Sequence, residues 1–240
     1  MLDRGALEIR DAQARMGELV LQGVHGGIAS LYEKPALALQ GKVAGPMPEF
    51  LRYVAQSPIG GWLHNGLANA TSTGNAELTL ALAIPLHEAD ATTVNGTLAL
   101  ANNDVRLVPS APLLAGAHAR VDFTEHGVTV SAGGARVLGG DASFDGGTQP
   151  DGGLKFNAQG TVTADGLRRV ADEPTLVRLA QRVTGQASYR LQIGIAKGQT
   201  EFALTSPLVG VGLALPAPLD KPADAPWPLR VSTVVSFDAQ

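Results

Sequence analysis

Residues 76 to 86 hold the side chains whose types and spacing point most directly to a chemical role. Every second position is a large aliphatic residue, at Leu78, Leu80, Leu82 and Ile84, with small or polar residues between them. Successive side chains of a β-strand point to opposite faces, so one face of this strand is aliphatic throughout. Such a face performs no covalent chemistry. It either packs against a second apolar layer or, if left open, holds hydrocarbon from another molecule.

The same kind of apolar alternation recurs further along the chain. The residues that repeat it are Leu98, Leu100, Phe123, Leu191 and Ile193. Together with the four aliphatic residues of 78 to 84, these side chains would supply a continuous apolar floor if their strands lie in one sheet.

The reactive side chains, by contrast, show no catalytic arrangement. The chain has no cysteine, and its five histidines lack the H-x-x-x-H or H-x-E spacing of a zinc site. No G-x-S-x-G motif, P-loop or G-x-G-x-x-G motif is present. The acidic residues are dispersed, so no carboxylate pair for acid and base catalysis stands out. The sequence therefore predicts a protein that is not an enzyme and that needs no metal or other cofactor.

The alternation continues along most of the chain and predicts a mostly β fold. We expect three strands within residues 5 to 44 and further strands up to the last one at 229 to 237. Asn95-Gly96 is a hairpin-turn signal, because both central positions of a type I′ turn need positive φ, and Asn102-Asn103-Asp104 predicts a second turn. Five prolines between residues 216 and 228 predict a crossover that is not helical.

Two segments have helical spacing instead. Residues 48 to 67 begin with Pro48 and Glu49, which favour the first turn of a short helix over 48 to 56. Residues 165 to 184 form the second segment, with Leu167 to Val170 as a separate turn, Pro174 at a helix start and Gly185 as the residue after the helix end. Its four arginines, at positions 168, 169, 178 and 182, are typical of a solvated face, and contact with anionic lipid head groups is the alternative.

Length and charge limit the class of protein. The 240 residues are within the range of a single all-β domain, so we expect one domain over 1–240. Charged residues are 17% of the chain, the net charge is −4, and no basic run is longer than two residues, which argues against a nucleic-acid partner. No stretch has the roughly 18 apolar residues of a membrane span.

The order of several motifs resembles the YhdP branch of the AsmA-like proteins of the Gram-negative envelope. The matching segments are GNAELTLALAIPL (74–86), VNGTLALANNDVRL (94–107), VDFTEHGV (121–128), VLGG (137–140), SPLVGVGLALPAPLDKP (206–222) and WPLRV (227–231). The most distinctive of these is the Leu-Pro-x-Pro-Leu-x-Lys-Pro sequence at 215–222.

This resemblance implies both a fold and a role. Members of the family look like long periplasmic bridges whose elongated, curved antiparallel sheet, a β-taco, forms an open apolar groove for phospholipids moving toward the outer membrane. By resemblance, the partners are phospholipid acyl chains, neighbouring segments of a longer protein, and the inner membrane through an anchor that this sequence lacks. The expected location is the periplasm, and the chain would be an internal segment of the bridge.

The residues themselves are compatible with lipid binding, and they leave two other functions open. Burying one CH₂ group is worth about 0.8 kcal/mol, so a chain of roughly 16 carbons would gain on the order of 12 kcal/mol from a continuous apolar floor. A structural or adhesive β-sandwich or solenoid would instead bury the same aliphatic face in a closed core. A hydrolase acting on envelope glycans is a third hypothesis, and no visible acid and base pair supports it.

Overall fold

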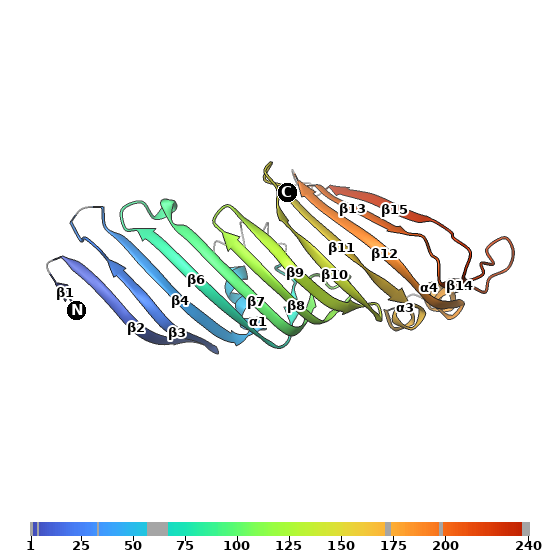
Figure 1. Cartoon of the computed structure of the whole chain (residues 1–240), viewed down its shortest axis with the longest axis horizontal. Coiled ribbons are helices and arrows are strands. Elements are labelled where there is room, and N and C mark those ends of the chain that lie inside the picture. Colours follow the sequence, from blue (N-terminus) through green and yellow to red (C-terminus); the bar gives the residue numbers. More distant parts are fainter. Residues whose placement is uncertain are drawn as a thin grey trace. The chain divides into compact units, whose positions relative to one another are not determined.

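A computed structural model describes residues 2–3, 5–32, 34–56, 67–170, 174–196 and 199–236. The described strands form one large antiparallel sheet that is not closed, with the order β1-β2-β3-β4-β6-β7-β8-β9-β10-β11-β12-β13-β15 (Figure 1). β14 pairs with β12, and β5 pairs with β7. The predicted mostly β class and the open antiparallel sheet are therefore confirmed.

Strand order follows chain order, so most connections are short hairpins. The strands are β1 Leu2–Asp3, β2 Ala6–Met16, β3 Leu19–Ile28, β4 Ala36–Pro46, β5 Thr71–Ser72, β6 Asn75–Pro85, β7 Thr93–Arg106, β8 Leu114–Thr124, β9 Gly127–Val137, β10 Gly140–Thr148, β11 Leu154–Thr163, β12 Val183–Ala196, β13 Gln199–Ser206, β14 Val211–Leu213 and β15 Leu229–Ser236. The helices are α1 Met47–Gln56, the 3₁₀-helix η1 Ala89–Ala91, α3 Ala164–Val170 and α4 Pro174–Gln181.

The chain divides into two compact units. Unit 1 comprises residues 1–109 and 118–129, and unit 2 comprises residues 110–117 and 130–240. Unit 1 contains α1, and unit 2 contains α3 and α4. In both units helical structure directly follows one strand of the sheet, β4 in unit 1 and β11 in unit 2.

α1 confirms the helix predicted over residues 48 to 56. Met47, Phe50 and Leu51 are buried, at the i, i+3 and i+4 spacing of one helix face. Pro48 occupies the first turn, where its missing N–H leaves no gap in the hydrogen-bond ladder. Residues 57–66 of the predicted helical segment lie outside the described part of the chain.

The prediction for residues 165 to 184 is confirmed for the helix start at Pro174, where α4 begins, and was wrong in two other respects. Residues 167–170 belong to the helix α3 rather than to a separate turn, and Val183 and Thr184 already belong to β12. Gly185 is likewise a strand residue, with φ +80, and a Cβ at this position would lie 2.0 Å from the Gly210 carbonyl oxygen. Glycine is needed there because β14 and its preceding turn approach β12 closely, rather than because a helix ends.

Arg168 joins the two helices to the sheet, so the solvated face predicted for it was only part of its role. Its Nε donates a hydrogen bond to the Ala180 carbonyl at 3.2 Å, and its Nη2 donates one to the Val183 carbonyl at 2.7 Å. A third contact is the ion pair between Arg168 and Asp165. The first of these bonds satisfies a carbonyl in the last turn of α4, and the second links α3 to the first residue of β12.

Both turns predicted within residues 95 to 104 were also wrong, because β7 runs through them without interruption. Asn103 is fully buried and ties β7 to the turn between β5 and β6. Its Nδ2 donates to the carbonyls of Thr73 and Asn75, each at 2.9 Å, and its Oδ1 accepts from the Ala101 N–H at 3.0 Å. The asparagine pair is thus an internal brace of the sheet.

The proline-rich segment after β14 is a crossover without helix, as predicted. Lys221 lies within it and is only 4% exposed. Its Nζ donates hydrogen bonds to the carbonyls of Val211, at 2.7 Å, and Pro222, at 3.0 Å. This buried ammonium group therefore holds the crossover against β14, and it does so with hydrogen bonds to backbone carbonyls.

Candidate functional site

The sheet of unit 1 has one apolar face, built from rows of directly opposed side chains. One row runs from Leu21 through Val43 and Leu78 to Leu98, across β3, β4, β6 and β7. A second row contains Leu39, Leu82 and Val94, and a third contains Ile28, Leu37 and Ile84. Opposed residues of neighbouring strands point to the same side, so these rows form a continuous surface. We call it the apolar face of unit 1.

Seven of the predicted lining residues lie on this face. Leu78, Leu80, Leu82 and Ile84 alternate along β6, Leu98 lies opposite Leu78, and Leu100 lies opposite the buried Ala76. Phe123 joins them from β8, because its ring covers Gly96, the residue opposite Leu80. All seven are partly buried, and none is fully buried.

Aromatic rings fill the hollows that glycines leave on the sheet. A Cβ at Gly96 would lie 2.2 Å from Cζ of Phe123, which places the ring directly over the glycine. Unit 2 repeats the arrangement, since a Cβ at Gly133 would lie 2.4 Å from Cδ2 of Phe144. Glycine beneath a ring lets the ring lie close to the strand, so the surface stays apolar without a gap.

We expect Gly96→Ala to destabilise the chain by about 1–3 kcal/mol, the usual cost of forcing extra volume into a packed site. The added methyl group must displace the Phe123 ring. Gly194→Ala is a matched control, because the nearest atom to a Cβ there, Cβ of Glu201, is 3.9 Å away. The free energy of unfolding in urea measures both changes. If Gly96→Ala lowers the free energy of unfolding no more than Gly194→Ala does, the Phe123 ring does not pack closely on Gly96.

One end of the apolar face of unit 1 is covered by α1. Met47, Phe50 and Leu51 form a buried cluster with Leu19 and Ala76, and the partly buried Val43, Leu78, Leu98 and Leu100 pack against this cluster. Three predicted lining residues are therefore partly covered by protein. Among the described residues, that cluster does not extend to Leu80, Leu82 or Ile84, which occupy the other part of β6.

Unit 2 has an apolar face of its own, and it contains the last two predicted residues. Leu191 lies between Ala158 of β11 and Leu204 of β13, and Ile193 lies between Phe156 and Phe202 on the same two strands. Phe202 is 37% exposed, and Val231, opposite Leu204, is 49% exposed. The face is thus open to solvent along this part of β12, β13 and β15.

Helical and crossover segments cover one end of this second face too. Ala164 of α3 and Val211 of β14 form a buried cluster with Val183 and Ala187 of β12, and Leu167, Leu208 and Leu213 pack against it. Ala187 points to the same side as Leu191, because the two are four residues apart on one strand. Each unit therefore has an apolar face that is closed at one end and partly exposed beyond it.

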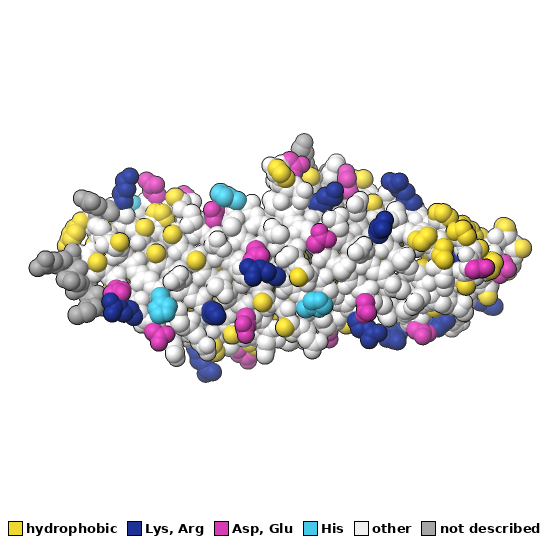
Figure 2. Space-filling model, viewed as in Figure 1, with side chains coloured by type: hydrophobic (Ala, Val, Ile, Leu, Met, Phe, Trp, Pro, Cys, Tyr) yellow, Lys and Arg dark blue, Asp and Glu magenta, His cyan; other side chains and the backbone are white. Residues whose placement is uncertain are grey.

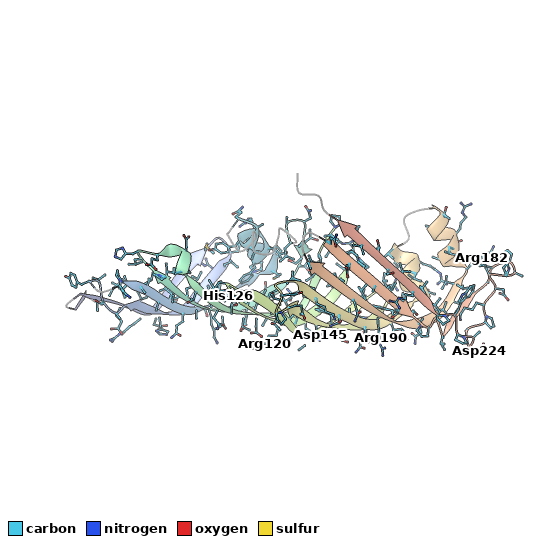
Figure 3. The ribbon with its side chains drawn as sticks, turned by 90° about the horizontal axis from the view of Figure 1, so that it is seen from above. Arg120, His126, Asp145, Arg182, Arg190 and Asp224 are labelled. Atoms are coloured by element: carbon cyan, nitrogen blue, oxygen red, sulfur yellow. The ribbon has the colours of Figure 1, made fainter. Side chains whose placement is uncertain are left out.

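The opposite side of the sheet is polar. In unit 1, Arg120 pairs with Asp122 at 2.8 Å, and the Thr97 hydroxyl donates to Asp122 at 2.6 Å. The hydrogen bond from Arg120 is the larger cause, and that from Thr97 the smaller one, of a lowered pKa at Asp122. Both hold the pKa of the Asp122 carboxyl below its ordinary value because they stabilise its charged form. Figure 3 shows Arg120 on the side of its sheet away from α1, and shows Asp145 and Arg190 on the side away from α3 and α4.

Charged side chains are scattered over the face of the molecule that Figure 2 presents, without a large field of either sign. In unit 2 the register explains their placement, since Arg190 lies opposite Thr205, which in turn lies opposite Arg230. In each unit, the two sides of the sheet therefore differ in chemistry. The apolar face can bind apolar groups, and the polar side interacts with water.

Several residues of the two apolar faces were not among the predicted lining residues. They are Leu21, Ile28, Leu37, Leu39, Val43 and Val94 in unit 1, and Phe144, Phe156, Phe202, Leu204 and Val231 in unit 2. The alternation of apolar residues within each strand could have identified them as residues of one strand face. The register between strands was needed to place them on the same face as Leu80 or Ile193.

The described part of the chain contains no group of three His, Asp or Glu side chains that could hold a metal ion. None of the helices described is both long and apolar enough to cross a membrane. In a comparison with protein families, a family model described as YhdP protein matches residues 1–236. Neither the curated proteins nor the solved structures contain a match to this chain.

Proposed function

Because the chain belongs to the YhdP family, we propose that it is a section of a periplasmic bridge that conducts phospholipids between the inner and outer membranes. The family is a lipid-transport family of the cell envelope and is not known for catalysis. In this section the acyl chains lie on the apolar faces of the two units. The protein provides a surface for movement and makes or breaks no covalent bond.

The observation that carries the proposal is the partial exposure of the aliphatic rows. Leu82 lies between Leu39 and Val94, Ile84 lies opposite Leu37, and Leu80 lies between Gly41 and Gly96. All three leucine and isoleucine side chains of this part of β6 keep part of their surface in solvent. A closed structural or adhesive domain would bury these side chains in its core. Large apolar surfaces left open on a protein usually mark the place where an apolar partner binds.

The expected strength of binding suits movement along the face. A fully buried CH₂ group gains about 0.8 kcal/mol, and a chain lying on an open face loses water from about half of its surface. A chain of roughly 16 carbons would then gain on the order of 6 kcal/mol. That is enough to draw the chain out of water and too little to hold it permanently, as conduction between successive sites requires.

The polar side of the sheet restricts the acyl chains to the apolar side. Arg120, Asp122 and Thr97 form a hydrogen-bonded group on that side. Moving a hydrocarbon chain over such a group would require breaking its hydration and its bonds. Lipids would therefore use the apolar side only, while the polar side faces the aqueous periplasm.

Neighbouring segments of a longer protein complete the proposal as partners. β1 and β15 end the strand order, so each has one side without a paired strand among the described residues. Such edges can extend a sheet by pairing with another strand. Adding strands at both edges would lengthen the apolar path toward each membrane.

Native mass spectrometry of the purified chain, combined with lipid extraction, tests the proposal. We expect phospholipid to copurify when the chain is produced in a Gram-negative periplasm, and to be displaced by added detergent. Phospholipid should be enriched over its level in a periplasmic protein of similar size with a closed core. A chain that is free of lipid, and that stays so after incubation with phospholipid vesicles, would contradict the proposed function.

A further inference from the structure

An open pocket of about 540 Å³ lies beside α4 in unit 2. α4 contributes Arg178 and Leu179, Arg182 follows the helix, and the chain after β14 contributes the opposite wall. That wall consists of Ala214, Leu215 and Pro216. The volume is within the usual range for binding sites of small ligands.

The two walls of the pocket are fixed to each other by backbone hydrogen bonds. The Ala214 N–H donates to the Arg182 carbonyl at 2.9 Å, and Leu213 lies opposite Val183 in the pairing of β14 with β12. Arg168 adds its bonds to the carbonyls of Ala180 and Val183 on the α4 side. The pocket is therefore held by the fold, although its arginine side chains are exposed.

The chemistry of the lining is that of a site for an anionic amphiphile. Two guanidinium groups lie four residues apart, and none of the described residues that line the pocket is acidic. Guanidinium groups bind phosphate oxygens with paired, charge-assisted hydrogen bonds. The other four lining residues are apolar, and Leu179 is 44% exposed. A ligand that combines a phosphate with hydrocarbon matches both parts of the lining.

More apolar surface lies close by in the sequence. Val209 in the turn before β14 is 46% exposed, and Leu219 and Trp227 of the crossover are 51% and 39% exposed. Figure 2 shows hydrophobic side chains gathered over β14 and the crossover that follows it, at the right of the picture. The pocket is also at the closed end of the apolar face of unit 2, because β12 runs from Val183 through Ala187 to Leu191.

We propose that this pocket binds the phosphate head group of an anionic phospholipid, with Arg178 and Arg182 on the phosphate and Leu179, Leu215 and Pro216 against the first part of the acyl chains. The inference rests on the proposed function, and it adds a head-group site at one end of an acyl-chain surface. The opposite side of the sheet offers two arginines for comparison, Arg190 and Arg230, which lie on either side of Thr205.

The test measures the affinity of the 240-residue chain for dihexanoylphosphatidylglycerol by calorimetry. The double variant Arg178→Gln/Arg182→Gln is expected to bind this lipid about tenfold more weakly or worse, because two charge-assisted contacts are lost. Arg178→Lys/Arg182→Lys, which keeps the charge, should retain more affinity than the glutamine variant. The control Arg190→Gln/Arg230→Gln removes the same charge from the polar side and should bind as the wild type does. Circular dichroism confirms that every variant is folded.

Two further probes identify the source of the anion. Dihexanoylphosphatidylcholine, which carries no net charge, should bind the wild type more weakly than the phosphatidylglycerol does. Inorganic phosphate should bind more weakly still, because it lacks the hydrocarbon. If inorganic phosphate binds as tightly as the anionic lipid, or if the glutamine variant of Arg178 and Arg182 binds as the wild type does, the head-group site is overturned.

A photoreactive benzophenone side chain at position 193 separates this inference from the proposed function. If lipid crosslinks there while the affinity for phosphatidylglycerol is unchanged by the loss of both arginines, only the head-group site fails. If no lipid crosslinks there and none binds in the calorimeter, both the proposed function and the head-group site fail.

Discussion

Leu80→Asp is expected to reduce the phospholipid bound to unit 1 at least tenfold. Leu80 lies in the middle of β6, between Gly41 and Gly96 on the neighbouring strands. A carboxylate at this position must either lose its hydration beneath an acyl chain or keep the chain away, and removing hydration from an unpaired charge costs several kcal/mol. A cost of only 1.4 kcal/mol is already a factor of ten in affinity.

Thr79→Asp provides the matched control for that variant. Thr79 is the adjacent residue, lies on the polar side opposite Lys42 and Thr97, and is exposed. The two variants add the same charge at neighbouring positions, so a general effect of charge would appear in both. Lipid per protein is measured by native mass spectrometry after loading from vesicles. Equal lipid content in Leu80→Asp and Thr79→Asp would show that lipid does not lie on the apolar face of unit 1.

Asn103→Ala is expected to lower the free energy of unfolding by about 2–4 kcal/mol. The variant loses three hydrogen bonds and leaves the Thr73 and Asn75 carbonyls and the Ala101 N–H without their partner. Each buried polar group left without a partner costs about 1–3 kcal/mol, and water entering the space would recover part of that cost. The effect is large because Asn103 is 0% exposed.

Asn95→Ala is the control, since Asn95 is an exposed residue of the same strand. It should change the free energy of unfolding by no more than about 0.5 kcal/mol, as most surface substitutions do. Urea unfolding followed by circular dichroism measures both variants, with hydrogen exchange at β5 and β6 to locate the loss. Similar values for the two variants would mean that Asn103 does not brace the sheet.

The alternation of apolar residues was sufficient to predict a mostly β fold and the aliphatic composition of one face of β6. Leu78, Leu80, Leu82 and Ile84 share a face because of their spacing alone, and the structure places them so. The partial cover of Leu78 by α1 could not be predicted in the same way. It depends on where a helix packs after leaving β4, and no local pattern in the sequence specifies that position.

Glycine and asparagine accounted for the errors. Asn95-Gly96 has the composition of a hairpin turn, yet Gly96 lies within β7. Glycine is required at this strand position because the Phe123 ring occupies the space that a side chain would fill. Gly185 has the position of a residue after a helix, yet it is a strand residue pressed against the Gly210 carbonyl. In both places the reason for glycine is a contact with a distant part of the chain, which local turn preferences do not contain.

The most direct test of the central claim is photocrosslinking that distinguishes the two sides of the sheet. A photoreactive benzophenone side chain is placed in turn at positions 80 and 193, on the apolar faces, and at positions 79 and 192, on the polar side, in cells of a Gram-negative bacterium. We predict phospholipid adducts at 80 and 193 and none above background at 79 and 192. Adducts of equal yield at all four positions, or at none of them while the same probes crosslink to protein, would contradict the account.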